Sequence, residues 1–169
     1  PDKDTDALYT NIDTDDYNRF AINPNETLQF LTIHDGFTLW DKINLSYDGT
    51  AEERAKMVKQ ASAMLFTSQG KIIMHAGAEI GRTKPFPEGG REAGRAETSE
   101  DYNVDSDLSN YDHFHENSYS SSDFVNKIRW SRKENPVFEG IFDYYKGLIA
   151  MRRAIPALRY NDAQDIRDG

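Results

Sequence analysis

One stretch of the sequence decides the fold: TLQFLTIHDGFTLWDK, residues 27–42. Its first part, residues 27–33, is rich in apolar and β-branched side chains, which predicts a buried strand. The strand ends directly in His34-Asp35-Gly36. Because barrel enzymes place catalytic groups at the carboxyl ends of parallel strands, Asp35 is a candidate catalytic residue. The alternative is that Asp35 caps a following helix and that His34 is satisfied locally.

The next clear element is a helix over residues 51–68. Thr50 is placed to cap it, Glu53 completes a capping box, and Gly70 stands at a suitable C-terminal stop. The apolar positions that keep helical spacing are Met57, Ala61, Met64 and Leu65.

Residues 71–76 predict a second buried strand, and residues 141–154 predict a final amphipathic helix that Pro156 ends. The expected inner stripe of that helix is Ile141, Tyr144, Tyr145, Leu148, Ile149 and Arg152. Between these two elements the pattern dissolves after Gly77 for about sixty residues, far more than the roughly 12–15 of an ordinary loop. Strands that alternate with helices predict an α/β fold with a parallel sheet. Two strands cannot bury both faces of such a sheet, so we expect the chain to be part of a larger barrel.

Composition narrows the class of protein. The chain has 169 residues, a formal net charge of -9 and 12% aromatic residues. This acidity argues against nucleic acid and against an anionic membrane surface as partners, and the aromatic content argues against a disordered tail. The absence of cysteine excludes disulfides and thiolate metal sites. No segment reaches the roughly 20 apolar residues that span a bilayer. We see no signal peptide, and a start at Pro1 indicates a piece of something longer.

Four blocks follow one another along the chain: residues 27–42, 69–84, 116–130 and 147–159. The first resembles the strand-7 motif of the pullulanase and glycogen-debranching branch of the α-amylase family (glycoside hydrolase family 13). The second resembles strand 8 and its exit, the third a stretch in the loop after strand 8, and the fourth the end of helix 8. Gly36 stands where pullulanases commonly have Asn and matches isoamylase and glycogen-debranching relatives, so the resemblance leaves the exact substrate open.

The resemblance implies an α/β fold class, with this chain as the C-terminal part of a catalytic (β/α)8 TIM barrel. That part runs from strand 7 to helix 8 and includes a long loop after strand 8. Residues 1–26 would lead into strand 7, residues 27–160 would form the barrel part, and residues 161–169 would link toward a following domain.

The same resemblance implies a retaining glycosidase that hydrolyses α-1,6 links in pullulan and branched α-glucans. Asp35 matches the third catalytic carboxylate, which stabilises the transition state, and His34 matches a histidine that binds sugar hydroxyls. The nucleophile after strand 4 and the general acid after strand 5 belong to Arg-x-Asp and Glu-Gly-Trp blocks, and neither block is found here. We therefore expect this chain alone to be inactive.

The block after strand 8 supplies four candidate substrate-binding residues: Asn117, Tyr119, Asp123 and Asn126. Amide and carboxylate groups suit the recognition of glucose hydroxyls. An equally supported alternative is that these side chains fold the loop through Asx turns.

Three further side chains are assigned to structure rather than to chemistry. Trp40 and Trp130 could be sugar platforms, but an aromatic side chain just inside an element is more often part of the core. Glu79 follows a strand and invites the role of general acid. In the block that it matches, however, this residue serves loop positioning.

Residues 101–112 place oxygen ligands at alternate positions, in the manner of a calcium loop. Ser106 replaces the required glycine and Asp112 replaces the bidentate glutamate, so we expect no metal site and no required cofactor, with calcium as the alternative. His113 and His115 stand two apart without a ligand cluster and are expected to be solvated.

Three partners follow from the resemblance: an α-glucan such as pullulan, amylopectin or glycogen, the missing N-terminal part of the barrel, and a second copy of the chain. The last two arise because two barrel strands leave open edges. No nucleic acid or membrane partner is expected. The rival interpretation is a non-catalytic carbohydrate-binding or interaction module. For location, the resemblance favours a secreted or cell-surface bacterial enzyme over a cytoplasmic one.

Overall fold

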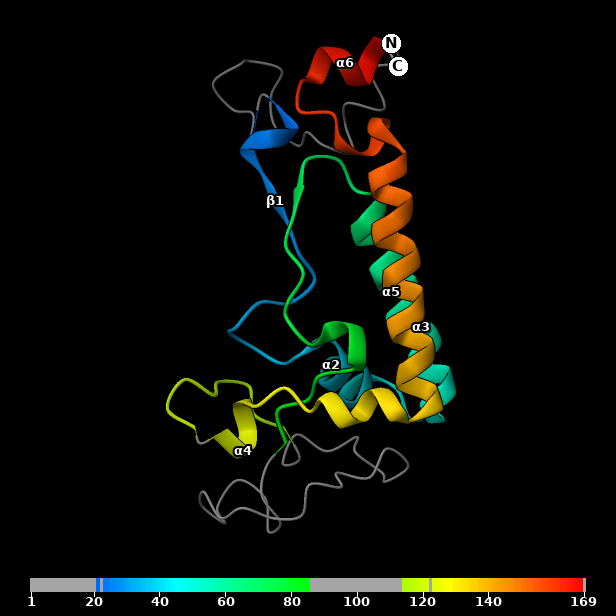
Figure 1. Cartoon of the computed structure of the whole chain (residues 1–169). Coiled ribbons are helices and arrows are strands. Elements are labelled where there is room, and N and C mark those ends of the chain that lie inside the picture. The colour runs from blue at the N-terminus through cyan, green and yellow to red at the C-terminus, as the bar shows by residue number, and fades with distance from the viewer. Residues whose placement is uncertain (1–20, 22, 86–113, 122, 169) are drawn as a thin grey trace.

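The molecule is built around two long helices that pack side by side. The computed structural model describes residues 21, 23–85, 114–121 and 123–168. In Figure 1, α3 (Ala51–Thr67) and α5 (Pro136–Ala154) run next to each other, and the segment that contains β1 (Leu28–Gln29) lies across from them. The helix α2 (Leu39–Ser46) lies at the lower end of this pair.

The other described elements are short. In chain order they are η2 (Pro24–Glu26), β2 (Lys71–Ile72), η3 (Ala78–Ile80), α4 (Asp123–Asn126), η6 (Trp130–Glu134), η7 (Pro156–Arg159) and α6 (Ala163–Asp168). Both η3 and η6 pack against α5, so the segments that follow β2 are held to the helix pair. No helix in the described part of the chain combines the length and apolar character that crossing a membrane requires.

The core lies between the helices and is rich in aromatic rings. Phe66 of α3 meets Tyr145 of α5 edge to face, with 5.8 Å between ring centroids. Trp40 of α2 meets Phe138 at the start of α5 in the same manner, at 4.9 Å. All four side chains are buried. The prediction that Trp40 belongs to the core is therefore confirmed.

The predicted helix over residues 51–68 is present as α3, and the face that it buries matches the expected positions only in part. Its capping box is formed, because Glu53 N donates to Thr50 Oγ1 and Thr50 N donates to the Glu53 carboxylate. Of the four apolar positions with helical spacing, Leu65 is buried, whereas Met57 and Met64 are 36% and 67% exposed. The buried positions are Ala51, Arg54, Ala55, Val58, Ser62, Leu65 and Phe66.

The final helix, α5, begins at Pro136 rather than at the predicted Ile141. The missed signal is Asn135, whose side chain caps the helix by accepting from Val137 N at 2.9 Å, followed by proline at the first helical position. Two predicted members of the inner stripe, Tyr144 and Ile149, are 37% and 39% exposed. The stripe that packs on α3 is narrower and consists of Phe138, Ile141, Tyr145, Leu148 and Arg152.

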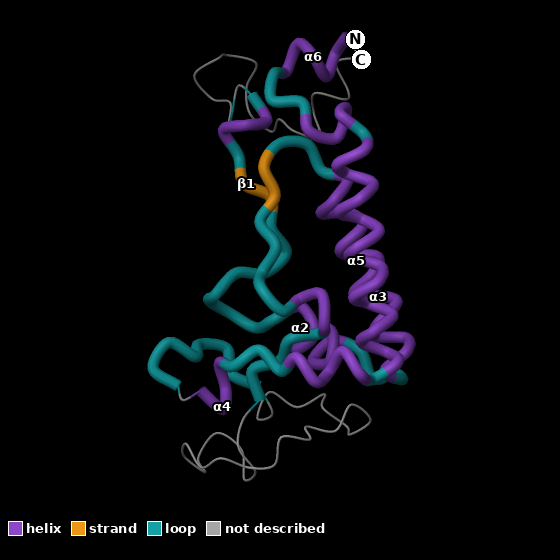
Figure 2. The backbone as a smooth tube through the Cα atoms, in the orientation of Figure 1, coloured by secondary structure: helices purple, strands orange, loops and turns teal. Residues whose placement is uncertain are grey.

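The two predicted strands pair with each other in parallel, as expected, but they are much shorter. β1 and β2 each have two residues, and Leu28 lies opposite Lys71 in the register. Figure 2 shows the two strands beside each other, with loop continuing beyond them toward α2 and η3. The expected burial is wrong for the apolar residues of the first strand, because Leu28 is 54% and Phe30 50% exposed. No further strand pairs with either one in the described part of the chain, so these side chains stay about half exposed.

The stretch after Gly77 is more ordered than predicted. Its described parts contain η3, α4 and η6, and a β-bridge joins Pro85 to Phe114. Residues 161–169, expected to be a link, contain α6. Residues 1–20 and 86–113 lie outside the described part of the chain.

Arg152 ties the end of α3 to α5. Its guanidinium is buried and donates to the carbonyl oxygens of Phe66, Ser68 and Gly70, at 2.8, 2.7 and 2.6 Å. Carbonyl groups at a helix C-terminus have no partner within the helix. One side chain of α5 therefore donates hydrogen bonds to carbonyl groups at the end of α3 and in the turn that leads into β2.

We expect Arg152→Met to lower the free energy of unfolding by roughly 2–4 kcal/mol, because it leaves three carbonyl groups without their donor. Urea unfolding followed by circular dichroism measures the loss. The matched control is Arg153→Met, the exposed neighbour on the same helix, which should change stability by less than about 0.5 kcal/mol. Equal losses in the two variants would contradict this role for Arg152.

Candidate active site

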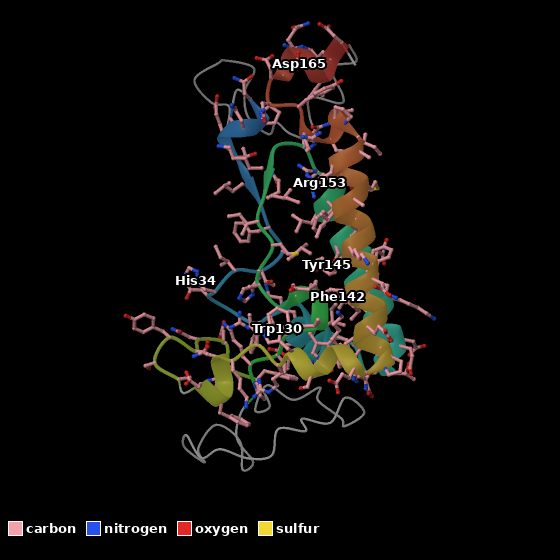
Figure 3. The ribbon with its side chains drawn as sticks, viewed as in Figure 1. His34, Trp130, Phe142, Tyr145, Arg153 and Asp165 are labelled. Carbon is pink, nitrogen blue, oxygen red and sulfur yellow. The ribbon has the colours of Figure 1, made fainter. Side chains whose placement is uncertain are left out.

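The His34-Asp35-Gly36 loop follows β1 and stands away from the helices. The side chains of His34 and Asp35 are 79% and 74% exposed, and His34 Nε2 lies 3.4 Å from Asp35 Oδ2. Figure 3 shows His34 directed outward, away from α3 and α5. Gly36 has a φ of +72°, a conformation that favours glycine and turns the chain back toward α2.

Asp35 does not cap the following helix. The N-cap of α2 is Thr38, whose hydroxyl accepts from Asp41 N at 3.1 Å. The alternative role considered for Asp35 is therefore wrong, and its carboxylate is left open to solvent beside His34. An exposed carboxylate in the loop that leads from a strand to a helix is placed to meet a ligand rather than to hold the fold.

Sequence reasoning missed a buried carboxylate one turn into α2. Asp41 is 0% exposed and accepts from Thr83 Oγ1 at 2.6 Å and from Lys84 N at 2.9 Å. Burial raises the pKa of Asp41 from 3.8 to about 6, and the hydrogen bonds from Thr83 and Lys84 oppose that rise. Asp41 thus joins the segment after β1 to the segment after η3. Its only sequence signal was its place in the strand-7 motif, which does not name a partner.

Lys84 reaches back from the same segment to the candidate loop. Its side chain is buried, and its ammonium donates to the carbonyl oxygens of His34 at 2.6 Å and Gly36 at 3.0 Å. Burial lowers the pKa of Lys84, as does the charge of Arg82, while Asp41 and Asp35 oppose this effect. The backbone on both sides of Asp35 is therefore held by a single side chain.

Arg82 and His75 lie next to this lysine. The Arg82 guanidinium donates to the carbonyl oxygens of Ala76 at 3.0 Å and Asn126 at 2.8 Å, and lies 3.2 Å from His75 Nε2. Burial lowers the pKa of His75 to about 4, helped by the charges of Arg82, Lys84 and His34. His75 is therefore neutral near pH 7. Arg82 connects the end of the second strand segment to α4.

The four predicted substrate-binding residues lie in one loop and in α4. Asn117 Oδ1 accepts from Tyr119 N at 3.1 Å, which is an Asx turn. The amide nitrogen of Asn126 donates to Ser118 O and Ser121 O, and its oxygen accepts from Ser118 Oγ at 2.7 Å. Both asparagines thus help to fold the loop. Tyr119 is 95% exposed and Asp123 is exposed, so sugar recognition by these two stays a prediction.

Trp130 departs from its assigned role, whereas the role of Glu79 stays a prediction. Trp130 was wrongly placed in the core, because it starts η6 at the surface and is 60% exposed. Glu79 lies in η3, and its Oε2 is buried without a hydrogen-bond partner among the described residues.

No metal site emerges from the part of the chain that the structure describes, where no cluster of three or more His, Asp or Glu side chains could hold an ion. Residues 101–112, with the calcium-like spacing, and His113 lie outside the described residues. His115 is described; its backbone N donates to Lys84 O at 2.8 Å.

Comparisons with known proteins point to one group of enzymes. Pullulanase A of Streptococcus pneumoniae is 32% identical over 185 residues, which cover 98% of this chain and 14% of that protein. The product complex of the multi-modular glycogen-degrading pneumococcal virulence factor SpuA matches with a TM-score of 0.72 at 32% identity, over 89% of this chain and 17% of the other. A pullulanase from Paenibacillus barengoltzii in complex with maltohexaose and α-cyclodextrin matches with a TM-score of 0.67 at 34% identity, over 90% and 19%. No protein-family model matches the chain.

The fold of most of this chain is thus similar to part of the fold of these enzymes. The chain belongs to the pullulanase branch of the α-amylase family, as its four sequence blocks indicated. It spans 14% of the length of pullulanase A.

The raised pKa of Asp41 predicts a pH dependence of stability. Between pH 4 and 6 the folded chain keeps the Asp41 proton and the unfolded chain releases it, so the free energy of unfolding should fall as the pH rises through this range. The fall should be at most roughly 3 kcal/mol and should level off above about pH 6. Asp41→Asn removes the titrating carboxyl group and keeps its shape. The difference in free energy of unfolding between this variant and wild type should therefore change across pH 4–6.

Urea unfolding at several pH values between 3.5 and 7 measures this difference. Asp48→Asn, at an exposed position in the loop after α2, is the control and should follow the wild-type profile. Parallel profiles for Asp41→Asn and wild type would show that Asp41 does not titrate in this range.

Proposed function

We propose that this chain forms the part of a (β/α)8 barrel from strand 7 to helix 8 in a pullulanase-type enzyme. That enzyme would hydrolyse α-1,6 links in pullulan and branched α-glucans with retention of configuration. In this assignment β1 and β2 belong to strands 7 and 8, α3 is the crossover helix between them, and α5 is helix 8. The parallel pairing of β1 with β2 and the length of α3 between them support the assignment.

The observation that carries the proposal is the exposed Asp35 in the loop between β1 and α2, with His34 3.4 Å away. In a retaining glycosidase the transition state resembles an oxocarbenium ion. A carboxylate held near that developing positive charge stabilises it. Asp35 would have this role, and His34 would donate to a hydroxyl of the cleaved glucose. The nucleophile and the general acid would come from the part of the barrel that matches strands 4 and 5.

The exposed apolar side chains of the first strand support a place inside a larger barrel. Leu28 and Phe30 are both at least half exposed, and barrel strands are normally covered on both faces. We infer that residues 27–160 pack against the preceding part of the barrel, or against a second copy of the chain when that part is absent. Residues 161–169 would lead toward a following domain.

The substrate of the whole enzyme would be an α-glucan. SpuA is described as glycogen-degrading and was solved as a product complex, and the Paenibacillus pullulanase was solved with maltohexaose. Tyr119 and Asp123 are free to contact glucose units from the loop after strand 8, and no cofactor would be required. We propose a secreted or cell-surface location for this enzyme, as the sequence resemblance favours.

We expect Asp35→Asn in the longer enzyme to lower kcat by about 10²–10³-fold, because the change removes a negative charge and keeps the shape. The side chain is 74% exposed, so the melting temperature should stay within a few degrees of wild type. Release of reducing sugar from pullulan measures the rate, and Asp48→Asn is the control at another exposed aspartate. A turnover within a few-fold of wild type would refute this role for Asp35.

The purified 169-residue chain should release no reducing sugar from pullulan above a blank. Catalytic groups that act as a unit lose nearly all of the rate together, and two of the three expected carboxylates have no match in this sequence. Activity that survives in the chain, and that disappears with Asp35→Asn, would show that the nucleophile and the acid are present here after all.

A further inference from the structure

Lys84 makes an unusual use of a buried ammonium group. The side chain is 1% exposed, yet its two hydrogen bonds go to main-chain carbonyl groups, those of His34 and Gly36. These carbonyl groups belong to the residues that precede and follow Asp35 in the chain. Burying an ammonium group costs free energy unless hydrogen bonds compensate the loss of water. We therefore asked what these two hydrogen bonds do for the loop.

The lysine is itself fixed by Asp41. Lys84 N donates to Asp41 Oδ2 at 2.9 Å, and Thr83, its neighbour, donates to Asp41 Oδ1 at 2.6 Å. Asp41 in turn belongs to the first turn of α2, which Thr38 caps. The ammonium therefore projects from a backbone that is anchored to the helix directly after the candidate loop.

The loop has little else to hold it. Among the described residues, Lys84 is the side chain that donates to the backbone of residues 34–36. The side chains of His34 and Asp35 are exposed and touch each other, and Gly36 allows the turn without fixing it. Without the ammonium, the direction of the Asp35 carboxylate would be set by a short, freely rotating segment.

We propose that Lys84 is a positioning residue for the reaction: its ammonium holds the carbonyl oxygens of His34 and Gly36, the two neighbours of Asp35 in the chain, and so sets where the carboxylate points. The inference rests on the role proposed above for Asp35. The effect on the rate should be large, because a displacement of about 1 Å of a catalytic group can lower the rate on the order of 10²-fold. A structural clamp alone would lower stability and leave the rate of the intact enzyme unchanged.

The test compares two buried cations that hold main-chain carbonyl groups in the longer enzyme. Lys84→Met removes the one beside Asp35, and Arg152→Met removes the one at the end of α3. Assays with pullulan are run below the melting temperature of both variants. We expect Lys84→Met to lower kcat on the order of 10²-fold with KM changed less than about 3-fold. Arg152→Met should keep kcat within a few-fold of wild type. If Lys84→Met does not fold, Lys84→Gln, which keeps a polar group, takes its place.

A double-mutant cycle then asks whether Lys84 acts through Asp35. In an Asp35→Asn background, Lys84→Met should cost little further rate, because the carboxylate that it positions is already gone. Additive losses would overturn the proposal, as would equal kcat losses in Lys84→Met and Arg152→Met. The role of Asp35 fails separately: it is refuted if Asp35→Asn alone stays active. If Asp35→Asn is inactive and Lys84→Met turns over like wild type, the positioning inference alone is wrong.

Discussion

The buried carboxylate of Asp41 is the interaction on which the arrangement of the candidate site depends. It accepts hydrogen bonds from the hydroxyl of Thr83 and the backbone of Lys84 and thereby joins two segments that lie more than forty positions apart in the chain. Burying a charged carboxylate carries a desolvation cost, which these two hydrogen bonds offset in part. The pKa rise to about 6 shows that burial outweighs the donors. The two segments of the site are thus joined by Asp41, a carboxylate whose charged form is disfavoured by burial.

The helix pair contributes more to the stability of the fold than the two strands do. α3 and α5 bury the aromatic core between them, and Arg152 of α5 donates to a carbonyl group at the end of α3, so the helix pair supplies most of the stability. The strands contribute two residues each and leave Leu28 and Phe30 exposed. Such a sheet gains little from its own packing. This imbalance agrees with a chain whose strands complete their burial against the rest of a barrel, as we propose.

Much of the fold could be predicted from the sequence, because helix caps and strand order are local signals. The Thr50–Glu53 capping box and the parallel pairing of two β-rich runs were both found. The buried face of α3 was predicted only in part: Leu65 is buried, whereas Met57 and Met64 are exposed, because helical spacing does not say which face α5 will cover. Asp35 and His34 stood out from their place after a strand. Asp41 and Lys84 did not, since their contacts span more than forty residues and no local pattern reveals such partners.

The most direct measurement is a crystal structure of the longer enzyme with a maltooligosaccharide bound. Our account predicts an Asp35 carboxylate oxygen and His34 Nε2 within hydrogen-bond distance of the glucose unit at the point of cleavage. It also predicts that the ammonium of Lys84 still donates to the carbonyl groups of His34 and Gly36. A sugar bound elsewhere, with Asp35 facing bulk solvent and Lys84 turned away from the loop, would contradict it.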